Sequence, residues 1–185
     1  MSRMICGGCE RPVSVCLCAS VVAVKPPCSV VIWQDPTEAR HRLSTTPLLH
    51  KTLLGSRLLV GDVFSYDDVF QDAGQPALVF PLEHKLALTG SSDESPIGTL
   101  LLLDGTWRKV RRLFHLNPWL YDLPHIRLAP EQLSRYSIRK SPREDGVSTM
   151  EAGLLACQWL DPNSDYLASL SVLDKMVELQ QSFIK

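Results

Sequence analysis

Short apolar runs alternate with amphipathic stretches along most of the chain. Aliphatic and β-branched side chains dominate residues 29–33, 58–60, 77–80 and 97–103, which is typical of buried strands. Residues 125–128 are interpreted as a further strand. Helical patterns occupy residues 44–55, residues 107–116, a segment that opens at Ser148, and residues 164–183. Strands that alternate with helices predict an α/β domain around a mostly parallel sheet.

Local signals indicate where two of these helices begin or end. Thr46 is expected to cap the helix over residues 44–55, with Pro47 in its first turn and Gly55 as a left-handed stop. Ser148 and Glu151 are three residues apart, a spacing typical of a capping box. Both helices are therefore predicted with defined starts.

Four cysteines set the first 28 residues apart. Cys6-x-x-Cys9 is followed, after six residues, by Cys16-x-Cys18. Two close pairs on two turns can place four thiolates around a tetrahedral, structural zinc ion. The alternative, four ordinary buried thiols, is rejected because so short a segment lacks the apolar residues to cover them. Cys28 and Cys157 are expected to be core residues. We therefore divide the chain into a four-cysteine zinc-binding segment, 1–28, and an α/β domain, 29–185.

The small net charge of −1 hides a strong asymmetry. Residues 108–143 carry nine basic and two acidic side chains, so this window is +7 and the remainder is −8. A stretch of one sign favours an anionic partner over chance clustering. Four of the basic residues fall on the helix over 107–116: Arg108, Lys109, Arg111 and Arg112.

Length and composition limit the class of protein. With 185 residues, 45% hydrophobic and 21% charged, the chain suits one domain with a small appendage and excludes a disordered or collagen-like protein. The longest unbroken apolar runs, such as Leu100 to Leu103, are far short of the ~20 residues that span a bilayer. The first ten residues have no apolar core of the signal-peptide type, so a cytoplasmic protein is expected.

Candidate chemistry gathers where strands are expected to end. Asp104 directly follows the strand over 97–103, and ligand sites of open α/β sheets lie beyond strand ends. The alternative is that Asp104 or Thr106 only caps the next helix. The segment 34–46 also follows a strand, and there Glu38 and Arg40 are most simply a salt pair.

A basic, hydroxyl-rich loop over 133–142 precedes the helix at Ser148, an arrangement that suits a carboxylate or phosphate. A solvated loop before an ordinary capped helix is the alternative. The chain has no Gly-rich phosphate loop and no nucleophile elbow. The residues alone therefore predict a zinc-knuckled α/β protein with a strand-end site and a basic face, and no particular reaction.

In this order, the motifs resemble the DTW-domain family, which is named for the Asp-x-Thr-Trp found here at Asp104, Thr106 and Trp107. The similarity covers nearly the whole chain. It includes the cysteine knuckle and four further motifs: Pro36-x-Glu38-x-Arg40 with Ser44-Thr45, Phe80-Pro81, Leu133-Ser134-x-Tyr136-x-x-Arg139, and Ser148-Thr149-x-Glu151-Ala152. Asp35 departs from the pattern, because a histidine is expected before Pro36.

The resemblance implies a SPOUT-like fold, knotted or unknotted, and a tRNA-uridine aminocarboxypropyltransferase. Such an enzyme moves the 3-amino-3-carboxypropyl group of S-adenosylmethionine (SAM) to N3 of a uridine, in the variable loop for bacterial members, and releases 5′-methylthioadenosine. Two alternatives stay open at this point. One is a SAM-dependent RNA methyltransferase, and the other is a non-catalytic, zinc-bearing RNA-binding module.

The resemblance also implies roles for individual residues. Asp104 is the candidate general base for the uridine N3 proton. Trp107 either stacks on a base or packs in the core beneath its helix. The candidate SAM-binding residues are Pro81, Leu103, Gly105, Thr106, Trp107, Tyr136, Arg139, Ser148, Thr149 and Glu151. The candidate tRNA-binding residues are Glu38, Arg40, Thr45, Arg108, Lys109, Arg111, Arg112 and Lys140.

Overall fold

A five-stranded parallel sheet organises the molecule. The computed structural model describes residues 4–9, 11–41, 43–71, 74–89, 97–128 and 146–182. The strands are β1 (Ser29–Gln34), β2 (Arg57–Val60), β3 (Gln75–Val79), β4 (Ile97–Asp104) and β5 (His125–Ile126). Their order is β2-β1-β4-β3-β5, and every neighbouring pair is parallel. The expected parallel α/β sheet is confirmed, and its strands all end at one edge.

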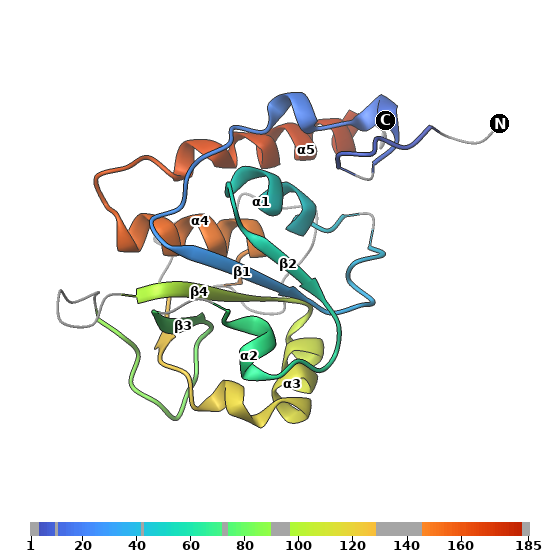
Figure 1. Cartoon of the computed structure of the whole chain (residues 1–185). Coiled ribbons are helices and arrows are strands. Elements are labelled where there is room, and N and C mark those ends of the chain that lie inside the picture. The colour runs from blue at the N-terminus through green and yellow to red at the C-terminus, as the bar shows by residue number, and fades with distance from the viewer. Residues whose placement is uncertain are drawn as a thin grey trace.

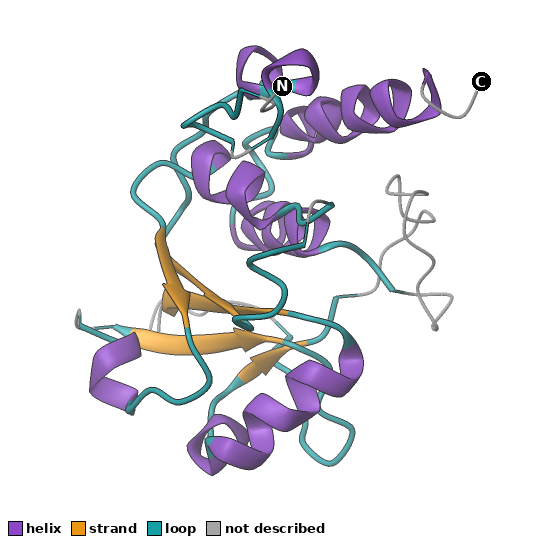
Figure 2. Cartoon of the chain, turned by 90° about the vertical axis from the view of Figure 1, so that its right-hand side faces the viewer, coloured by secondary structure: helices purple, strands orange, loops and turns teal. Residues whose placement is uncertain are grey.

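Helices cover both faces of this sheet. They are α1 (Thr46–Thr52), α2 (Tyr66–Val69), α3 (Trp107–Leu116), α4 (Thr149–Leu160) and α5 (Ser171–Ser182). Short 3₁₀ turns span Val13–Val15, Cys18–Ser20, Pro118–Tyr121 and Leu167–Leu170. Helices α1, α4 and α5 lie on one side of the sheet and α2 and α3 on the other (Figure 1). Figure 2 shows the same layers after a quarter turn.

Two helices differ in extent from the sequence prediction. Helix α1 follows Thr45, not Thr46, and it stops at Thr52 because Leu53 becomes extended and bridges Val24. Gly55 does adopt the expected left-handed conformation, with φ +77°. The segment predicted as one helix over 164–183 is a 3₁₀ turn followed by α5. Asp161 explains the late start, since its carboxylate accepts hydrogen bonds from Ser164 and Tyr166 and holds this stretch as a turn.

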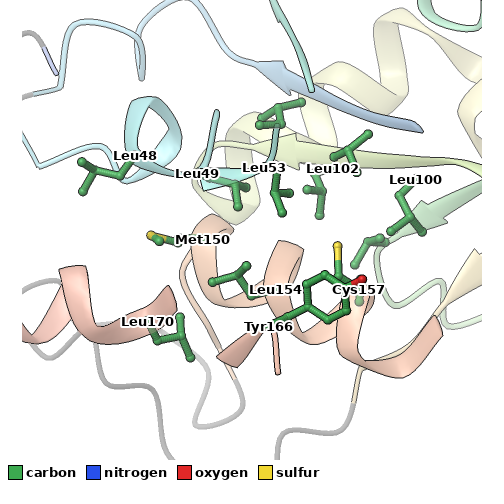
Figure 3. Packing of buried hydrophobic residues seen from close by; sticks show 14 of the residues in the cluster. Leu48, Leu49, Leu53, Leu100, Leu102, Met150, Leu154, Cys157, Tyr166 and Leu170 are labelled. Carbon is green, nitrogen blue, oxygen red and sulfur yellow. The ribbon is translucent and has the colours of Figure 1, made fainter. Parts of the chain in front are cut away.

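Successive residues of β1 and β4 point into two separate apolar clusters. On one face, Leu100 and Leu102 pack with Leu49 of α1 and Leu154 of α4 (Figure 3). On the other face, Leu101 and its neighbours pack against α3. A parallel strand that is buried on both faces has no polar alternation, which is why these strands appear in the sequence as continuous apolar runs.

The cysteine-bearing segment lies beside α5 (Figure 1). Cys9 and Leu17 are buried in the same cluster as α4 and α5. The Arg11 guanidinium donates to the carbonyl of Ser44 (3.2 Å) and to the sulfur of Met176 in α5 (3.3 Å). The segment is therefore joined to the α/β domain by both apolar and polar contacts. In the part of the chain that the structure describes, no helix is long and apolar enough to cross a membrane.

Candidate functional site

Asp104, the last residue of β4, is a buried carboxylate at the carboxyl edge of the sheet, and it is 7% exposed. The amide of Gln34, at the end of β1, donates to Oδ2 (2.7 Å). The hydroxyl of Thr149, the first residue of α4, donates to Oδ1 (2.5 Å). No ion pair among the described residues includes Asp104. Two neutral donors on separate elements thus hold this carboxylate in one orientation.

Gln34 connects Asp104 to a second layer of contacts. Its amide also donates to the hydroxyl of Ser44 (3.0 Å), in the segment that leads into α1. The carbonyl of the same serine accepts the hydrogen bond from Arg11. A continuous series of hydrogen bonds therefore runs from the cysteine segment to the carboxylate.

A cavity opens beyond the carboxyl ends of β3, β4 and β5, beside Asp104. Its walls are mostly apolar, with Arg127 and Thr149 as polar members. The lining residues are Val79, Phe80, Pro81, Leu102, Leu103, Gly105, Trp107, Val110, Ile126, Arg127, Leu128, Gly146, Val147, Thr149 and Ala152. Ligand sites of parallel α/β sheets occur at this edge.

Five of the expected SAM-binding residues line this cavity: Pro81, Leu103, Gly105, Trp107 and Thr149. The sequence analysis missed Phe80, Arg127, Leu128, Gly146 and Val147 as lining residues. All five lie directly after a strand or directly before α4. The strand-end rule, applied to every strand, would have found Phe80, Arg127 and Leu128, whereas Gly146 and Val147 precede a helix and lie outside that rule.

The start of α3 separates the roles of Thr106 and Trp107. The Thr106 hydroxyl accepts from the backbone N–H of Lys109 (3.4 Å), so Thr106, not Asp104, caps α3. Trp107 is half-buried, and its ring centroid lies 5.2 Å from that of Phe80. Its side chain therefore forms part of the cavity wall and not of the core beneath the helix.

The start of α4 carries the expected capping box. The Ser148 hydroxyl accepts from the N–H of Glu151 (3.3 Å), and the Glu151 carboxylate accepts from the N–H of Ser148 (2.7 Å). These two side chains hold the first turn of the helix, while Thr149 between them faces Asp104 and the cavity. The capping interpretation of Ser148 and Glu151 is therefore confirmed.

Ion pairs connect the segment that follows β1, which contains Asp35 and Glu38, to helix α3. Glu38, whose side chain is 1% exposed, pairs with Lys109 (2.8 Å) and not with Arg40, which is exposed. Arg112 contacts the buried Asp35 (3.4 Å) and the exposed Asp62 (2.7 Å). The hydrogen bond from this guanidinium holds the pKa of Asp62 below its usual range.

These pairs divide the basic residues of α3 into two kinds. Lys109 and Arg112 are held by carboxylates, whereas Arg108 and Arg111 are exposed on the helix. Thr45 is 5% exposed and precedes the first residue of α1. Tyr136, Arg139 and Lys140, with the rest of the basic loop over 133–142, lie outside the described residues.

The four cysteines of the first segment converge. Their sulfur atoms all lie within 4.8 Å of one another, with Cys6–Cys16 at 3.5 Å and the pairs Cys6–Cys18 and Cys9–Cys16 at 3.7 Å. A tetrahedral zinc with Zn–S bonds of about 2.3 Å requires S···S distances of about 3.8 Å. The observed separations fit that requirement. The cysteine cluster (Cys6, Cys9, Cys16 and Cys18) could therefore bind a metal ion.

The backbone of the same turn favours thiolate. Hydrogen bonds from the N–H groups of Cys9 and Gly8 lower the pKa of Cys6 to about 6, whereas burial raises the pKa of Cys18. Thiolate is the form that binds metal. Gly8 has no room for a side chain, since a Cβ there would lie 2.9 Å from the Cys18 sulfur. Outside the cluster, Cys157 is buried as expected, whereas Cys28 is half-buried, and burial raises the pKa of both thiols.

The sheet is parallel, and an apolar cavity and a fixed carboxylate lie at its carboxyl edge. These features define an α/β protein with a ligand site beyond its strand ends. The model of the DTW domain family matches residues 3–181, and the chain belongs to this family. No solved structure matches it.

Three curated relatives carry closely similar names. The tRNA-uridine aminocarboxypropyltransferase 2 of Drosophila melanogaster is 28% identical over 99% of this chain and 72% of its own length. The protein of the same name from Mus musculus is 32% identical over 88% of this chain and 58% of its own length. The tRNA-uridine aminocarboxypropyltransferase A of Arabidopsis thaliana is 26% identical over 99% of this chain and 83% of its own length.

Proposed function

We propose that this protein is a tRNA-uridine aminocarboxypropyltransferase. It transfers the 3-amino-3-carboxypropyl group of SAM to N3 of a tRNA uridine, and we place that uridine in the variable loop. The observation that carries the proposal is Asp104, the first residue of the Asp-x-Thr-Trp motif. Its carboxylate is held beside a strand-end cavity in a chain of the DTW family.

The cavity beyond β3, β4 and β5 suits SAM. Its apolar walls, including Phe80, Pro81 and Leu128, can enclose the adenosine portion. The start of α4 borders the same cavity through Thr149, and a helix amino terminus favours a carboxylate such as that of the amino acid portion. We therefore assign SAM to this cavity.

Asp104 supplies the base in this proposal. Uridine N3 carries a proton at neutral pH and becomes a good nucleophile only when that proton leaves. The carboxylate accepts the proton while the N3 electron pair forms a bond to the γ-carbon of the donor group. The bond from that carbon to sulfur breaks, and its electron pair stays on sulfur in neutral methylthioadenosine. Sulfonium is a good leaving group, so the protein's main tasks are orientation and proton removal.

Three structural features support the finer parts of the proposal. The sulfur geometry of the cysteine cluster supports a structural zinc with four protein ligands and no open position. The exposed Arg108 and Arg111 on α3 support tRNA binding along that helix. The all-parallel sheet with its ligand cavity at the carboxyl edge supports a SPOUT-like fold.

The direct test incubates purified protein with SAM and unmodified tRNA, followed by nucleoside mass spectrometry. Formation of 3-(3-amino-3-carboxypropyl)uridine together with methylthioadenosine is expected. Methylated nucleoside with adenosylhomocysteine would identify a methyltransferase instead. Binding of tRNA with no product would favour the non-catalytic RNA-binding module. Comparing tRNA from a deletion strain with tRNA from its parent then identifies the uridine.

A further inference from the structure

A second groove adjoins the candidate SAM cavity and shares Phe80, Pro81 and Trp107 with it. The residues after β3, Leu82 to Lys85, form one wall of this groove. Arg111 and Phe114 of α3, together with Tyr121 of the following 3₁₀ turn, form the opposite wall. The residues that line this groove and not the SAM cavity have no role in the proposed reaction; they are Leu82 to Lys85, Arg111, Phe114 and Tyr121.

Aromatic rings run through the groove. The centroid of Phe80 lies 5.2 Å from that of Trp107 and 5.1 Å from that of Phe114, and Phe114 lies 4.7 Å from Tyr121. Phe114 is buried, whereas Trp107 is half-buried and Tyr121 is 54% exposed. The row therefore offers an accessible ring at each end, with the rings of Phe80 and Phe114 between them.

Basic side chains accompany these rings, and hydrogen bonds join the two walls. Arg111 and His84 are exposed members of the lining. Glu83 is the acidic member, and it is also exposed. The Lys85 ammonium donates to the carbonyls of Tyr121 (3.4 Å), Asp122 (2.7 Å) and Leu123 (3.0 Å), so it holds one wall against the other. The groove is thus formed before any ligand arrives.

Exposed rings beside a guanidinium match the chemistry of an unpaired nucleotide. Every base has a π-face that can stack on an aromatic side chain, and the adjacent phosphate pairs with a cation. The groove cannot hold the reacting uridine itself, because N3 of that uridine must reach Asp104. Asp104 is bonded to α4, on the opposite face of the sheet from the cluster that contains Phe114. A neighbouring nucleotide of the same RNA can reach the groove.

We propose that this groove binds the base of an unpaired nucleotide that flanks the modified uridine, with Tyr121 and Trp107 as stacking surfaces and Arg111 at the phosphate. The inference rests on the proposed function, because it assumes an RNA substrate. Loss of one base–aromatic stack typically weakens binding by roughly 5- to 150-fold. The groove therefore contributes to selection of the RNA and not to the transfer step.

The test compares Tyr121→Ala with Tyr121→Phe. Tyr121→Ala should raise both the Kd for unmodified tRNA and the KM for tRNA by at least about 5-fold. The kcat at saturating tRNA and the Kd for SAM should not change. Tyr121→Phe keeps the ring and should bind tRNA like the wild type. Tyr66→Ala is the matched control, because Tyr66 is a 43% exposed tyrosine on α2 outside the groove.

A folded Tyr121→Ala protein that binds tRNA normally would overturn the inference. Should that variant fail to fold, photocrosslinking of wild-type protein to 4-thiouridine-substituted tRNA gives the answer without any substitution. Crosslinked peptides containing Trp107 or Tyr121 are expected, and crosslinks confined to other peptides would refute the groove. Both Kd and crosslinking are measured without turnover, so an inactive wild-type protein would refute the proposed reaction separately.

Discussion

Replacing Asp104 by asparagine separates the basicity of this side chain from its structural contacts. The asparagine oxygen can still accept from Gln34. Its amide nitrogen can donate to Thr149, because a hydroxyl can accept as well as donate. Asp104→Asn therefore keeps the shape and both hydrogen bonds but removes the group that takes a proton.

The two expected effects differ in size. Hydrogen bonds to a charged group contribute about 1.5–3 kcal/mol each, so Asp104→Ala, which loses both, should lower stability by about 3–6 kcal/mol. Asp104→Asn should cost no more than about 2 kcal/mol, which for a domain of this size lowers the Tm by roughly 4–8 °C. Loss of general-base assistance costs about 10²–10⁴-fold in rate, or about 2.7–5.5 kcal/mol in activation free energy.

Single-turnover transfer to unmodified tRNA at saturating SAM measures the rate, alongside SAM binding and thermal melting. SAM binding should survive in Asp104→Asn. Its rate deficit should shrink at alkaline pH, where solvent removes the N3 proton. Gln34→Met is the control, because it removes one hydrogen bond to Asp104, leaves the carboxylate and lies outside the lining of the SAM cavity. Near-normal transfer by a folded Asp104→Asn protein would refute the assignment of Asp104 as the base, and an early-melting variant would indicate a structural role.

The metal site, the basic helix and a buried histidine give three further predictions. Metal analysis should find close to one zinc per chain, and a chelator should lower the Tm; metal-free protein of unchanged stability would contradict the zinc assignment. Replacing Arg108 and Arg111 by Ala should weaken tRNA binding and flatten its salt dependence with little effect on the Tm. Lys109→Met should instead destabilise the fold, because it removes the Lys109 ammonium from the buried Glu38 carboxylate. The loss should be less than the ~3–5 kcal/mol typical of a fully buried pair. Equal losses of stability in the arginine variant and in Lys109→Met would contradict the distinction between exposed and paired basic residues of α3. Burial and the nearby charges of Lys85 and Arg127 lower the pKa of His125 in the folded protein below 6.5, its value in the unfolded chain. The contribution of neutral His125 to stability is therefore present above pH 6.5 and is lost as the pH falls below that value. Denaturant unfolding between pH 7 and 5 should show a smaller loss for His125→Leu than for the wild type.

The strands were predictable because burial on both faces leaves an unbroken apolar signature, as in Leu100 to Leu103. The strand β3 begins two residues earlier than expected, since Gln75 and Pro76 carry no such signal. Helix α2 was missed because it is a single turn, although Ser65 and Asp68 form a capping box around it. The local pattern of apolar and polar residues thus predicts long buried helices and strands and overlooks short exposed ones.

Site residues were predictable where the chemistry is local, and missed where it depends on the fold. The paired cysteines and the Asp-x-Thr-Trp motif are visible in the sequence. The Glu38–Lys109 pair joins residues 71 positions apart, so no window along the chain could reveal it. Arg127 was missed as a lining residue because the strand was predicted over residues 125–128, whereas β5 ends at Ile126 and leaves Arg127 beyond the strand end.

The hydrogen bonds from Arg11 through Ser44 and Gln34 to Asp104 have a thermodynamic consequence. A ligand that requires Asp104 in its observed orientation also favours the arrangement of the cysteine cluster that holds Arg11 in place. Linkage is reciprocal, so a substrate bound at the cavity should slow the loss of metal from the cluster, and a bound metal should strengthen substrate binding by the same factor. Metal occupancy and RNA modification would then be coupled properties of one molecule.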